Sequence, residues 1–569
     1  MRAKPVLRAV ARARLSATDS RRLRCLVRQA VRTPLRDGDL PPDLCSSFRA
    51  TYSRLSAAGQ RSFLGVLAEH LDSDDRAVSA AASALVLPQE AEARLLAHDA
   101  MRQALTPLHE LVLHAVGRQQ GGLPFLVSLR ADVLRALADE RARGTASSTA
   151  GTSIAHHGGE VGAPPPPAPL SAVSASLLRL LSYWFDGSSL ELRRVEWDSS
   201  PAALLERLMR YERVHAMEGW DDLHARLGPR GRVFALTHAQ MPLEPLVFVQ
   251  VALLDRAPTC LADVLPYRDA DGHFISSEHL VLPAVGHPEE DTDQVEEPKP
   301  AAEPTAGSEP RVAVFYSISS PHEGLRGVPL GRELLMRAIG RMRQEEPLVG
   351  TFMTLSPVPG FRSWLSSRWE RRQRGEDQSE AAEATESEAE AALLSSLEEA
   401  LAQASIPFGG LFGPPTPVHA DTDVAPPRAS QSRPPPSTAH AAPPPTPTAV
   451  SAPDACLRGP VVALVVRYLL VTQGRWRDPV AHFHQRNGAR LSHVHWAANM
   501  AGYAMAQSAG VMVSYSYQPE KLAANRAAYL ATGRVLATRE LASLLPSRAE
   551  RERVRVSTSA EEGGEGEQD

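Results

Sequence analysis

Three stretches of low apolar content divide this chain, and they decide how many folded parts it can have. Residues 144–169 are small, polar and Pro-rich, residues 288–310 are acidic and Pro-rich, and residues 371–457 pass from mixed charge to repeated prolines. Such composition buries too little apolar surface to offset the entropy lost on ordering, so we expect linkers or insertions. Within 371–457 only "EAEAALLSSLEEALAQ" resembles a helix. Because loop-closure entropy grows slowly with length, the flanks of this longest insertion can belong to one domain.

The segments between these stretches have two different patterns. Residues 39–142 repeat apolar side chains every three or four positions, as in Phe48, Tyr52 and Leu55, which predicts amphipathic helices packed together. Residues 232–240, 245–254 and 311–319 are predicted strands, and a glycine-containing loop, a helix and another strand follow. We therefore predict an α+β protein.

Its predicted parts are an N-terminal all-α helical bundle over residues 39–189 and a mixed α/β domain over residues 190–545. We expect the acidic residues 546–569 to be disordered.

The N-terminal segment is strongly basic. Residues 1–36 contain eleven Arg or Lys and one acid, Asp19, without an apolar core segment. This pattern is typical of an organelle transit peptide, so we predict a targeting segment over residues 1–38 and a location in the mitochondrial matrix. A plastid or cytoplasmic location, with a solvated basic arm, stays open. The C-terminal "EEGGEGEQD" is not a peroxisomal address.

The overall composition narrows the class of function. The net charge is −5, which argues against a nucleic-acid partner, and the four cysteines form no C-x-x-C pair, which argues against a zinc ribbon. The apolar run from Val461 is interrupted by Arg467 and is shorter than the ~20 residues of a membrane span. We therefore expect no membrane span and no metal.

One hydroxyl stands at an unusually rigid position. In "TFMTLSPVPGFRSWL", residues 351–365, Ser356 ends a predicted strand, and a Pro-Val-Pro-Gly turn follows. An ordinary strand followed by a stiff turn explains this pattern as well as a functional site does. The nearby aromatic residues Phe361, Trp364 and Phe483 fit a hydrophobic core or a wall that keeps a site dry.

A glycine-containing loop precedes the predicted helix. In "GLRGVPLGRELL", residues 324–335, Arg326 and Arg332 accompany three glycines. Such a loop can direct N–H groups at a pyrophosphate, with the helix N-terminus adding positive potential. Pro329 has no N–H, so the expected donors are Gly327, Val328, Leu330 and Gly331. Turns of this kind also occur for steric reasons alone.

Taken together, these motifs and several others closely resemble the malonyl-CoA decarboxylase family. The matching segments include "FYSIS", "GLRGVPLGRELL", "LSPVPGFRSWL", "DPVAHFHQRNGA" and "GVMVSYSY", in family order. The resemblance implies an N-terminal helical domain that self-associates and a catalytic domain similar to the GNAT acyltransferase fold. It implies conversion of malonyl-CoA to acetyl-CoA and CO₂, a step in fatty acid metabolism, without metal or organic cofactor.

The resemblance also assigns site residues. It implies that Ser356 and His484 are catalytic, and that Tyr517 lies near them. The malonyl-CoA-binding residues it implies are Arg326, Gly327, Val328, Pro329, Leu330, Gly331, Arg332, Ser356, His484 and Tyr517. The chain departs from the usual family motif at Gln485 and Arg486, and His482 has no counterpart.

The proposed reaction needs both catalytic groups. Loss of CO₂ leaves an enolate, which must be stabilised and protonated at carbon. We expect His484 to donate the proton, and Ser356 to bind the carboxylate or accept its proton. Two other functions stay open: a GNAT-type acyltransferase that uses acyl-CoA, and a malonyl-CoA-binding sensor without catalysis.

Overall fold

The computed structural model describes residues 42–70, 75–86, 90–149, 169–265, 310–374, 388–412, 455–471 and 477–556. The chain forms two compact units. The first comprises residues 1–213, 234–248 and 319–336, and the second comprises residues 214–233, 249–318 and 337–569. Because the units interleave along the chain, the border predicted at residue 189 stays a prediction.

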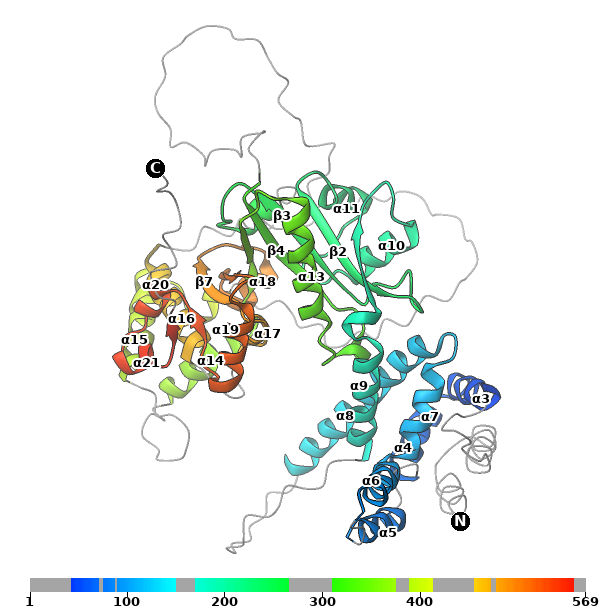
Figure 1. Cartoon of the computed structure of the whole chain (residues 1–569). Coiled ribbons are helices and arrows are strands. Elements are labelled where there is room, and N and C mark those ends of the chain that lie inside the picture. Colours follow the sequence, from blue (N-terminus) through cyan, green and yellow to red (C-terminus); the bar gives the residue numbers. More distant parts are fainter. Residues whose placement is uncertain are drawn as a thin grey trace, which may run out of the picture. The chain divides into compact units, whose positions relative to one another are not determined.

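The first unit consists mainly of helices (Figure 1). They are α3 (Pro42–Ser53), α4 (Ala57–His70), α5 (Asp75–Leu85), α6 (Ala91–Leu105), α7 (Leu108–Gly117), α8 (Gly122–Thr149), α9 (Pro169–Trp184) and α10 (Ala202–Tyr211). Aromatic side chains hold α3, α4 and α8 together, because the rings of Tyr52 and Phe63 and those of Tyr52 and Phe125 meet edge to face. The Tyr52 hydroxyl donates to Asp132 on α8 at 2.6 Å. These contacts confirm the helices predicted from the apolar periodicity.

The first unit also contains strand β1 (Leu190–Val195) and the 3₁₀ turns η1 (Gly187–Ser189) and η2 (Glu323–Leu325). Parts of β2 (Gly231–His238) and β3 (Val247–Leu254) belong to it, in the order β1-β2-β3. Helix α13 (Leu330–Glu345) begins in this unit, directly after the glycine-containing loop.

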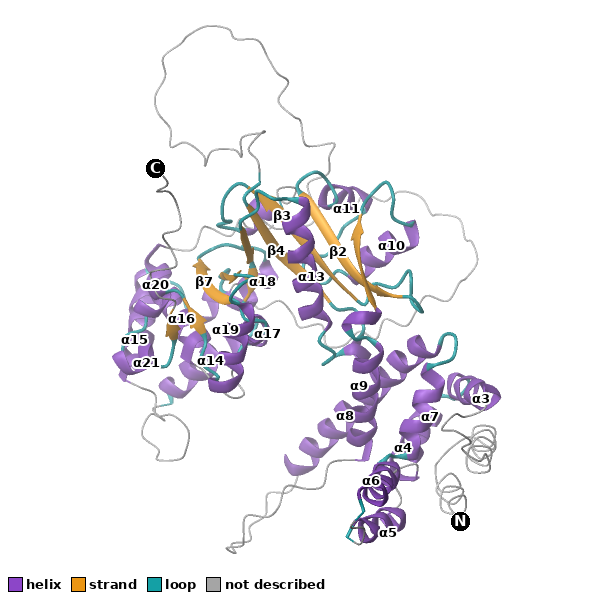
Figure 2. Ribbon diagram, viewed as in Figure 1, coloured by secondary structure: helices purple, strands orange, loops and turns teal. Residues whose placement is uncertain are grey.

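The second unit is built on a mixed sheet. Its strands follow the order β2-β3-β4-β5-β8-β7-β9-β10, and β6 pairs with β8. Figure 2 draws the strands in orange and labels β2, β3, β4 and β7. The bounds not yet given are β4 (Val312–Ser319), β5 (Thr351–Thr354), β6 (Ser356–Pro357), β7 (Arg490–His495), β8 (Met512–Tyr517), β9 (Leu536–Ala537) and β10 (Arg555–Val556). Strands β4 and β5 are parallel, whereas β8 is antiparallel to β5, β6 and β7. The predicted strands at 232–240, 245–254 and 311–319 are confirmed.

The second unit also contains helices. They are α11 (Trp220–Arg226), α12 (Leu261–Val264), α14 (Phe361–Gln373), α15 (Glu388–Gln403), α16 (Ala455–Val471), α17 (Pro479–Arg486), α18 (Gly502–Ser508), α19 (Leu522–Thr532), α20 (Arg539–Ser543) and α21 (Arg548–Glu552), with the 3₁₀ turn η3 (Phe408–Phe412). The α+β class is confirmed, while the likeness to GNAT enzymes stays a prediction.

One face of the sheet carries a hydrophobic core. Alternate side chains of β4 pack with residues of β5, β8 and α12, as the two-residue repeat of a strand requires. The members are Ala252, Leu261, Val264, Leu265, Val312, Val314, Tyr316, Met353, Leu355, Ala498 and Met512.

Two segments expected to be disordered are folded. Helix α15 and turn η3 lie inside the predicted insertion 371–457, and Leu394, Leu397 and Leu411 are buried. The regularly spaced apolar residues of α15 and η3 bury enough surface to fold, although the surrounding stretch is polar. Likewise α21 and β10 lie inside the predicted tail 546–569, with β10 paired to β9. The predicted segments 1–38 and 288–310 lie almost wholly outside the described residues.

A buried ionic cluster joins these two segments. Arg467 on α16 pairs with Glu390 on α15 and, through its Nε, with Glu550 on α21 at 3.0 Å. All three side chains are buried, and Glu390 also pairs with Arg368 on α14 at 3.2 Å, so the four charges compensate one another. No helix in the described ranges is long and apolar enough to cross a bilayer.

Candidate active site

Ser356 continues the register of strand β5. Phe352 lies opposite Tyr517, and four positions later Ser356 lies opposite Val513, so β5 and β6 follow β8 as one interrupted strand. Side chains two positions apart share a face, which brings Ser356 to the same side as Thr354 and Tyr515. The Ser356 hydroxyl donates to Thr354 Oγ1 at 2.9 Å. The pairing ends after Pro357, which lies opposite Met512, and the turn that follows leads into α14.

His484 lies in the short helix α17. The carboxylate of Asp478 caps this helix by accepting from the N–H groups of Val480 and Ala481, and Pro479 occupies the first helical position. His484 lies in the second turn and is buried.

Three predicted site residues meet in the second unit. His484 Nε2 lies 3.4 Å from Ser356 Oγ, and His484 Nδ1 lies 2.7 Å from the Tyr517 hydroxyl. The imidazole stacks on the ring of Tyr515, with 4.5 Å between centroids. Strands β6 and β8 and helix α17 therefore bring the serine, histidine and tyrosine into one buried chain of hydrogen bonds.

The environment of His484 favours its neutral form. Burial lowers its pKa to about 3, and burial also raises the pKa of Tyr517 well above its ordinary value. In the free protein at neutral pH, the imidazole is uncharged and the phenol keeps its proton.

The hydrogen-bond partners restrict the tautomer of His484. Thr354 Oγ1 accepts both from the Ser356 hydroxyl and from the Tyr515 N–H at 3.1 Å. Because the Ser356 proton points to Thr354, its lone pairs remain to accept from His484 Nε2–H. Nδ1 then accepts from the Tyr517 hydroxyl. The partners therefore select the tautomer of His484 that carries its proton on Nε2.

The glycine-containing loop belongs to the first unit. Arg130 on α8 donates to the Gly324 carbonyl at 2.6 Å and fixes the start of the loop. Burial, followed by the charge of Arg326, lowers the pKa of Arg130. Gly327 has a φ of 91°, a conformation that strongly favours glycine.

Only some of the expected N–H donors remain for a ligand. Val328 donates to Leu325 O and Leu330 to Val328 O, so both of these N–H groups already have backbone acceptors, and their role toward a ligand stays a prediction. Gly327 takes part in none of the turn hydrogen bonds found among the described residues. Gly331 lies in the first turn of α13, where N–H groups lack helical acceptors.

Other residues singled out in the sequence have structural contacts. Phe361 and Trp364 are fully buried and pack with Tyr468, so they belong to the core. The His482 ring hydrogen-bonds the Tyr529 hydroxyl at 2.7 Å, away from the His484 ring nitrogens. Gln485, one of the departures from the family motif, bonds both the N–H and the carbonyl of Leu536 at 3.0 Å, which ties α17 to β9.

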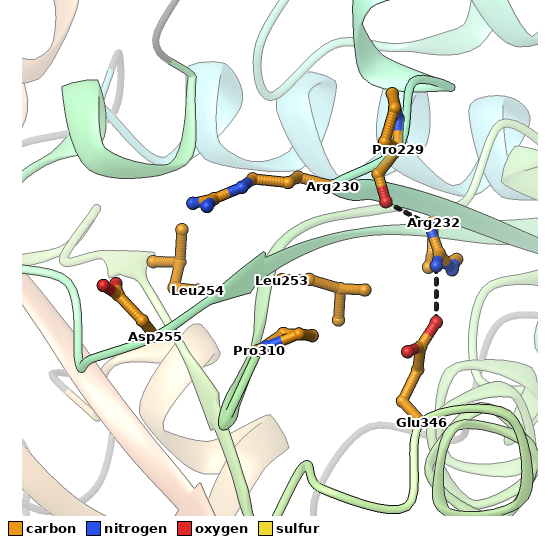
Figure 3. A pocket seen from close by; sticks show the side chains of 8 residues that line it. All are labelled: Pro229, Arg230, Arg232, Leu253, Leu254, Asp255, Pro310 and Glu346. Carbon is orange, nitrogen blue, oxygen red and sulfur yellow. Dashed lines mark hydrogen bonds and ion pairs between the residues drawn. The ribbon is translucent and has the colours of Figure 1, made fainter. Parts of the chain in front are cut away.

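A separate cavity of about 170 Å³ lies in the second unit (Figure 3). Its lining includes an ion pair between Arg232 and Glu346 and an acid, Asp255. None of the three residues that meet around His484 lines it. It is smaller than the ~300 Å³ of typical ligand pockets, and we assign it no role.

Sequence reasoning missed two polar residues of this site. Thr354 was detectable as a hydroxyl two positions before Ser356, on the same strand face. Asp478 was detectable as an Asp-Pro pair before a helix, which is a typical N-cap pattern.

Comparison with protein families gives one consistent result. Residues 71–185 match the malonyl-CoA decarboxylase N-terminal domain. Residues 188–282 and 288–555 match the malonyl-CoA decarboxylase C-terminal domain.

Individual relatives agree over most of the chain. The protein named malonyl-CoA decarboxylase, mitochondrial, from Anser anser anser is 27% identical over 519 residues, covering 88% of this chain and 82% of the relative. The protein of the same name from Mus musculus is 28% identical, covering 88% and 85%. The crystal structure of malonyl-CoA decarboxylase from Rhodopseudomonas palustris is 26% identical, with a TM-score of 0.62 over 94% of this chain and 99% of that chain.

Proposed function

Because this chain belongs to the malonyl-CoA decarboxylase family, we propose that it converts malonyl-CoA to acetyl-CoA and CO₂ with Ser356 and His484 as catalytic residues. The observation that carries this assignment is the 3.4 Å approach of His484 Nε2 to Ser356 Oγ in a buried network.

Decarboxylation forms an enolate, and hydrogen-bond donors in the site can stabilise its negative charge. When the bond between the carboxylate carbon and the α-carbon breaks, CO₂ leaves and the pair delocalises into the thioester as an enolate. A fixed hydrogen-bond donor to the developing oxyanion contributes roughly 2.7–4 kcal/mol. Ser356 turns its hydroxyl proton from Thr354 Oγ1 to the substrate carboxylate and so orients the carboxylate before cleavage.

His484 gains its proton when the substrate binds. The free imidazole is neutral, but a malonyl carboxylate beside it favours the imidazolium and raises its pKa. His484 therefore takes up a proton from solvent when the substrate binds. Departure of CO₂ removes the carboxylate, and Nε2 gives its proton to the α-carbon. The Tyr517 hydroxyl, which can donate or accept, keeps Nδ1 hydrogen-bonded in both states.

The CoA part of the substrate binds at the glycine-containing loop. The exposed Arg326, the Gly327 N–H and the N-terminus of α13 supply positive potential for phosphates. Arg332 lies in the first turn of the same helix.

The experiment is CO₂ release from malonyl-CoA by the purified full-length chain, without any acyl acceptor. Stoichiometric acetyl-CoA and CO₂ support the proposal. An acyltransferase would require an amine or carrier protein, and a sensor would bind malonyl-CoA without turnover. Either of those results would overturn the decarboxylase assignment.

We also propose import into mitochondria. The basic residues 1–36 support it, as do relatives whose names include the word mitochondrial, whereas bacteria supply the structural relatives. Imaging a fluorescent protein fused to residues 1–40 tests this location, and a diffuse cytoplasmic signal would contradict it.

A further inference from the structure

The carboxylate of Asp478 connects the two segments that carry Ser356 and His484. Its Oδ1 accepts from the N–H groups of Val480 at 2.9 Å and Ala481 at 3.0 Å, at the start of α17. Its Oδ2 accepts from the Gly360 N–H at 3.1 Å and from the Tyr468 hydroxyl at 3.3 Å. We propose that Asp478 is a positioning residue that sets the distance between Ser356 and His484, an inference that rests on the proposed function of that pair.

These bonds join the two segments at the points where each one turns toward the site. Gly360 closes the turn that follows Ser356, and Asp478 immediately precedes the helix that carries His484. Helix α17 has only eight residues, so its direction depends strongly on how its first turn is anchored. A shift of that anchor moves His484 relative to Ser356.

The third partner makes the connection rigid. Tyr468 is buried on α16, and its ring lies 5.3 Å from that of Trp364. A Cβ atom at Gly360 would lie 2.0 Å from the Tyr468 hydroxyl oxygen, so the backbone approaches this phenol as closely as only glycine allows. Asp478 is itself 2% exposed, so its carboxylate is shielded from water.

Helix capping alone does not explain these contacts. An N-cap needs one oxygen that accepts from the first turn, and Oδ1 already does this. The Oδ2 contacts reach residues 118 and 10 positions away and contribute nothing to the cap. The two oxygens therefore have separable roles.

The distance between Ser356 and His484 matters for catalysis because their hydrogen bond is already long. Ser356 Oγ and His484 Nε2 are 3.4 Å apart, near the outer limit of a hydrogen bond. A misplacement of 1 Å in an active site can lower the rate about 100-fold.

Asp478→Asn tests the proposal with little effect on the cap. Asparagine caps helices as well as aspartate does, but its –NH₂ group cannot accept from the Gly360 N–H. We expect kcat for malonyl-CoA to fall about 10–100-fold while KM changes less than about twofold, since the phosphate loop is untouched. Tyr468→Phe removes only the 3.3 Å bond and should give a smaller loss of kcat in the same direction.

Ser547→Ala is the matched control. Ser547 caps α21 by accepting from the Glu550 N–H, and the variant loses a cap without touching the candidate site. We expect a lower melting temperature and unchanged kcat. If Asp478→Asn folds and keeps wild-type kcat, or if kcat of Ser547→Ala falls equally, Asp478 has no positioning role. If Asp478→Asn does not fold, wild-type kcat in Tyr468→Phe overturns the proposal.

A second measurement does not depend on turnover. In protein labelled with ¹⁵N-histidine, the His484 signals are identified by their absence in His484→Asn. We expect Asp478→Asn to shift the His484 Nε2 resonance and Ser547→Ala to leave it in place. An unchanged resonance in Asp478→Asn contradicts the positioning role, whereas an inactive wild-type enzyme with the expected shift contradicts only the decarboxylase assignment.

Discussion

Ser356 Oγ lies 3.4 Å from His484 Nε2 although the two residues are 128 positions apart in the chain. Strand β8 brings the two residues together. It pairs with the segment of Ser356, and its Tyr515 stacks on the imidazole of His484 while its Tyr517 hydrogen-bonds it. The long insertion between the two residues therefore does not separate them.

Removal of either proposed catalytic group should lower turnover strongly. We expect Ser356→Ala and His484→Ala to reduce kcat, the latter by about 10²–10⁴-fold, because general acid catalysis typically contributes that much. The double variant should lose less than the product of the two single losses, since both groups act on one carbon. CO₂ release at saturating malonyl-CoA measures this, with melting temperature as the folding control. Near-normal turnover in His484→Asn would remove His484 as the proton donor.

The loop arginines should affect binding more than chemistry. Phosphate contacts are present in both the ground state and the transition state, so Arg326→Ala with Arg332→Ala should raise KM with a smaller change in kcat. The matched control is Arg343→Ala, near the other end of the same helix, and it should leave KM unchanged. A pure loss of kcat in the double variant would contradict phosphate binding at this loop.

Substrate binding should take up a proton. The pKa of free His484 is lowered to about 3 by burial, and a bound carboxylate raises it, so affinity for the malonyl group should weaken as pH rises. Titration calorimetry in buffers of different ionisation enthalpy, with a malonyl-CoA analogue that cannot lose CO₂, measures this uptake. His484→Asn should abolish it. No uptake in the wild type would mean that the neutral imidazole is the donor.

The free energy of unfolding should decrease in mild acid. Burial lowers the pKa of His484 to about 3 and that of His495 to about 4, whereas histidines of the unfolded chain titrate near ~6.5. Between these values the unfolded state binds more protons, so stability is full above ~6.5 and falls as pH drops toward 4. Urea unfolding at pH 7.5 and pH 5 tests this. The loss should be smaller in His495→Asn, and an identical loss there would exclude His495 as a contributor.

The insertion should divide into a dispensable part and an essential part. Replacing residues 414–453 with a Gly/Ser linker of about ten residues should preserve folding and turnover, because composition there supports no core. Extending the deletion to residue 388 should destabilise the protein, since Leu394, Leu397 and Leu401 are buried. Melting temperature and CO₂ release distinguish the two variants. Equal stability would show that α15 contributes nothing to the fold.

The sequence predicted the elements better than it predicted their partners. Apolar periodicity located the helices around Phe48 and Tyr52, and alternation located β2, β3 and β4. Ser356 and His484 were found through a family resemblance, since no local pattern brings together two residues on different elements. The role of Thr354 depends on strand register, which pairing with β8 fixes and local sequence does not. Helix α15 was underestimated because its apolar stripe is embedded in polar sequence.

The ionic cluster around Arg467 limits how far the C-terminus of this protein can be shortened. Removing one partner of a buried ion pair typically costs ~3–5 kcal/mol, and a truncation before Glu550 would leave Glu390 as the shared partner of Arg368 and Arg467. Affinity tags and fusion partners are therefore best joined after Val556, where the last described strand ends. The same guanidinium links α16 to both α15 and α21, so we expect the loss of either helix to lower the melting temperature of the protein.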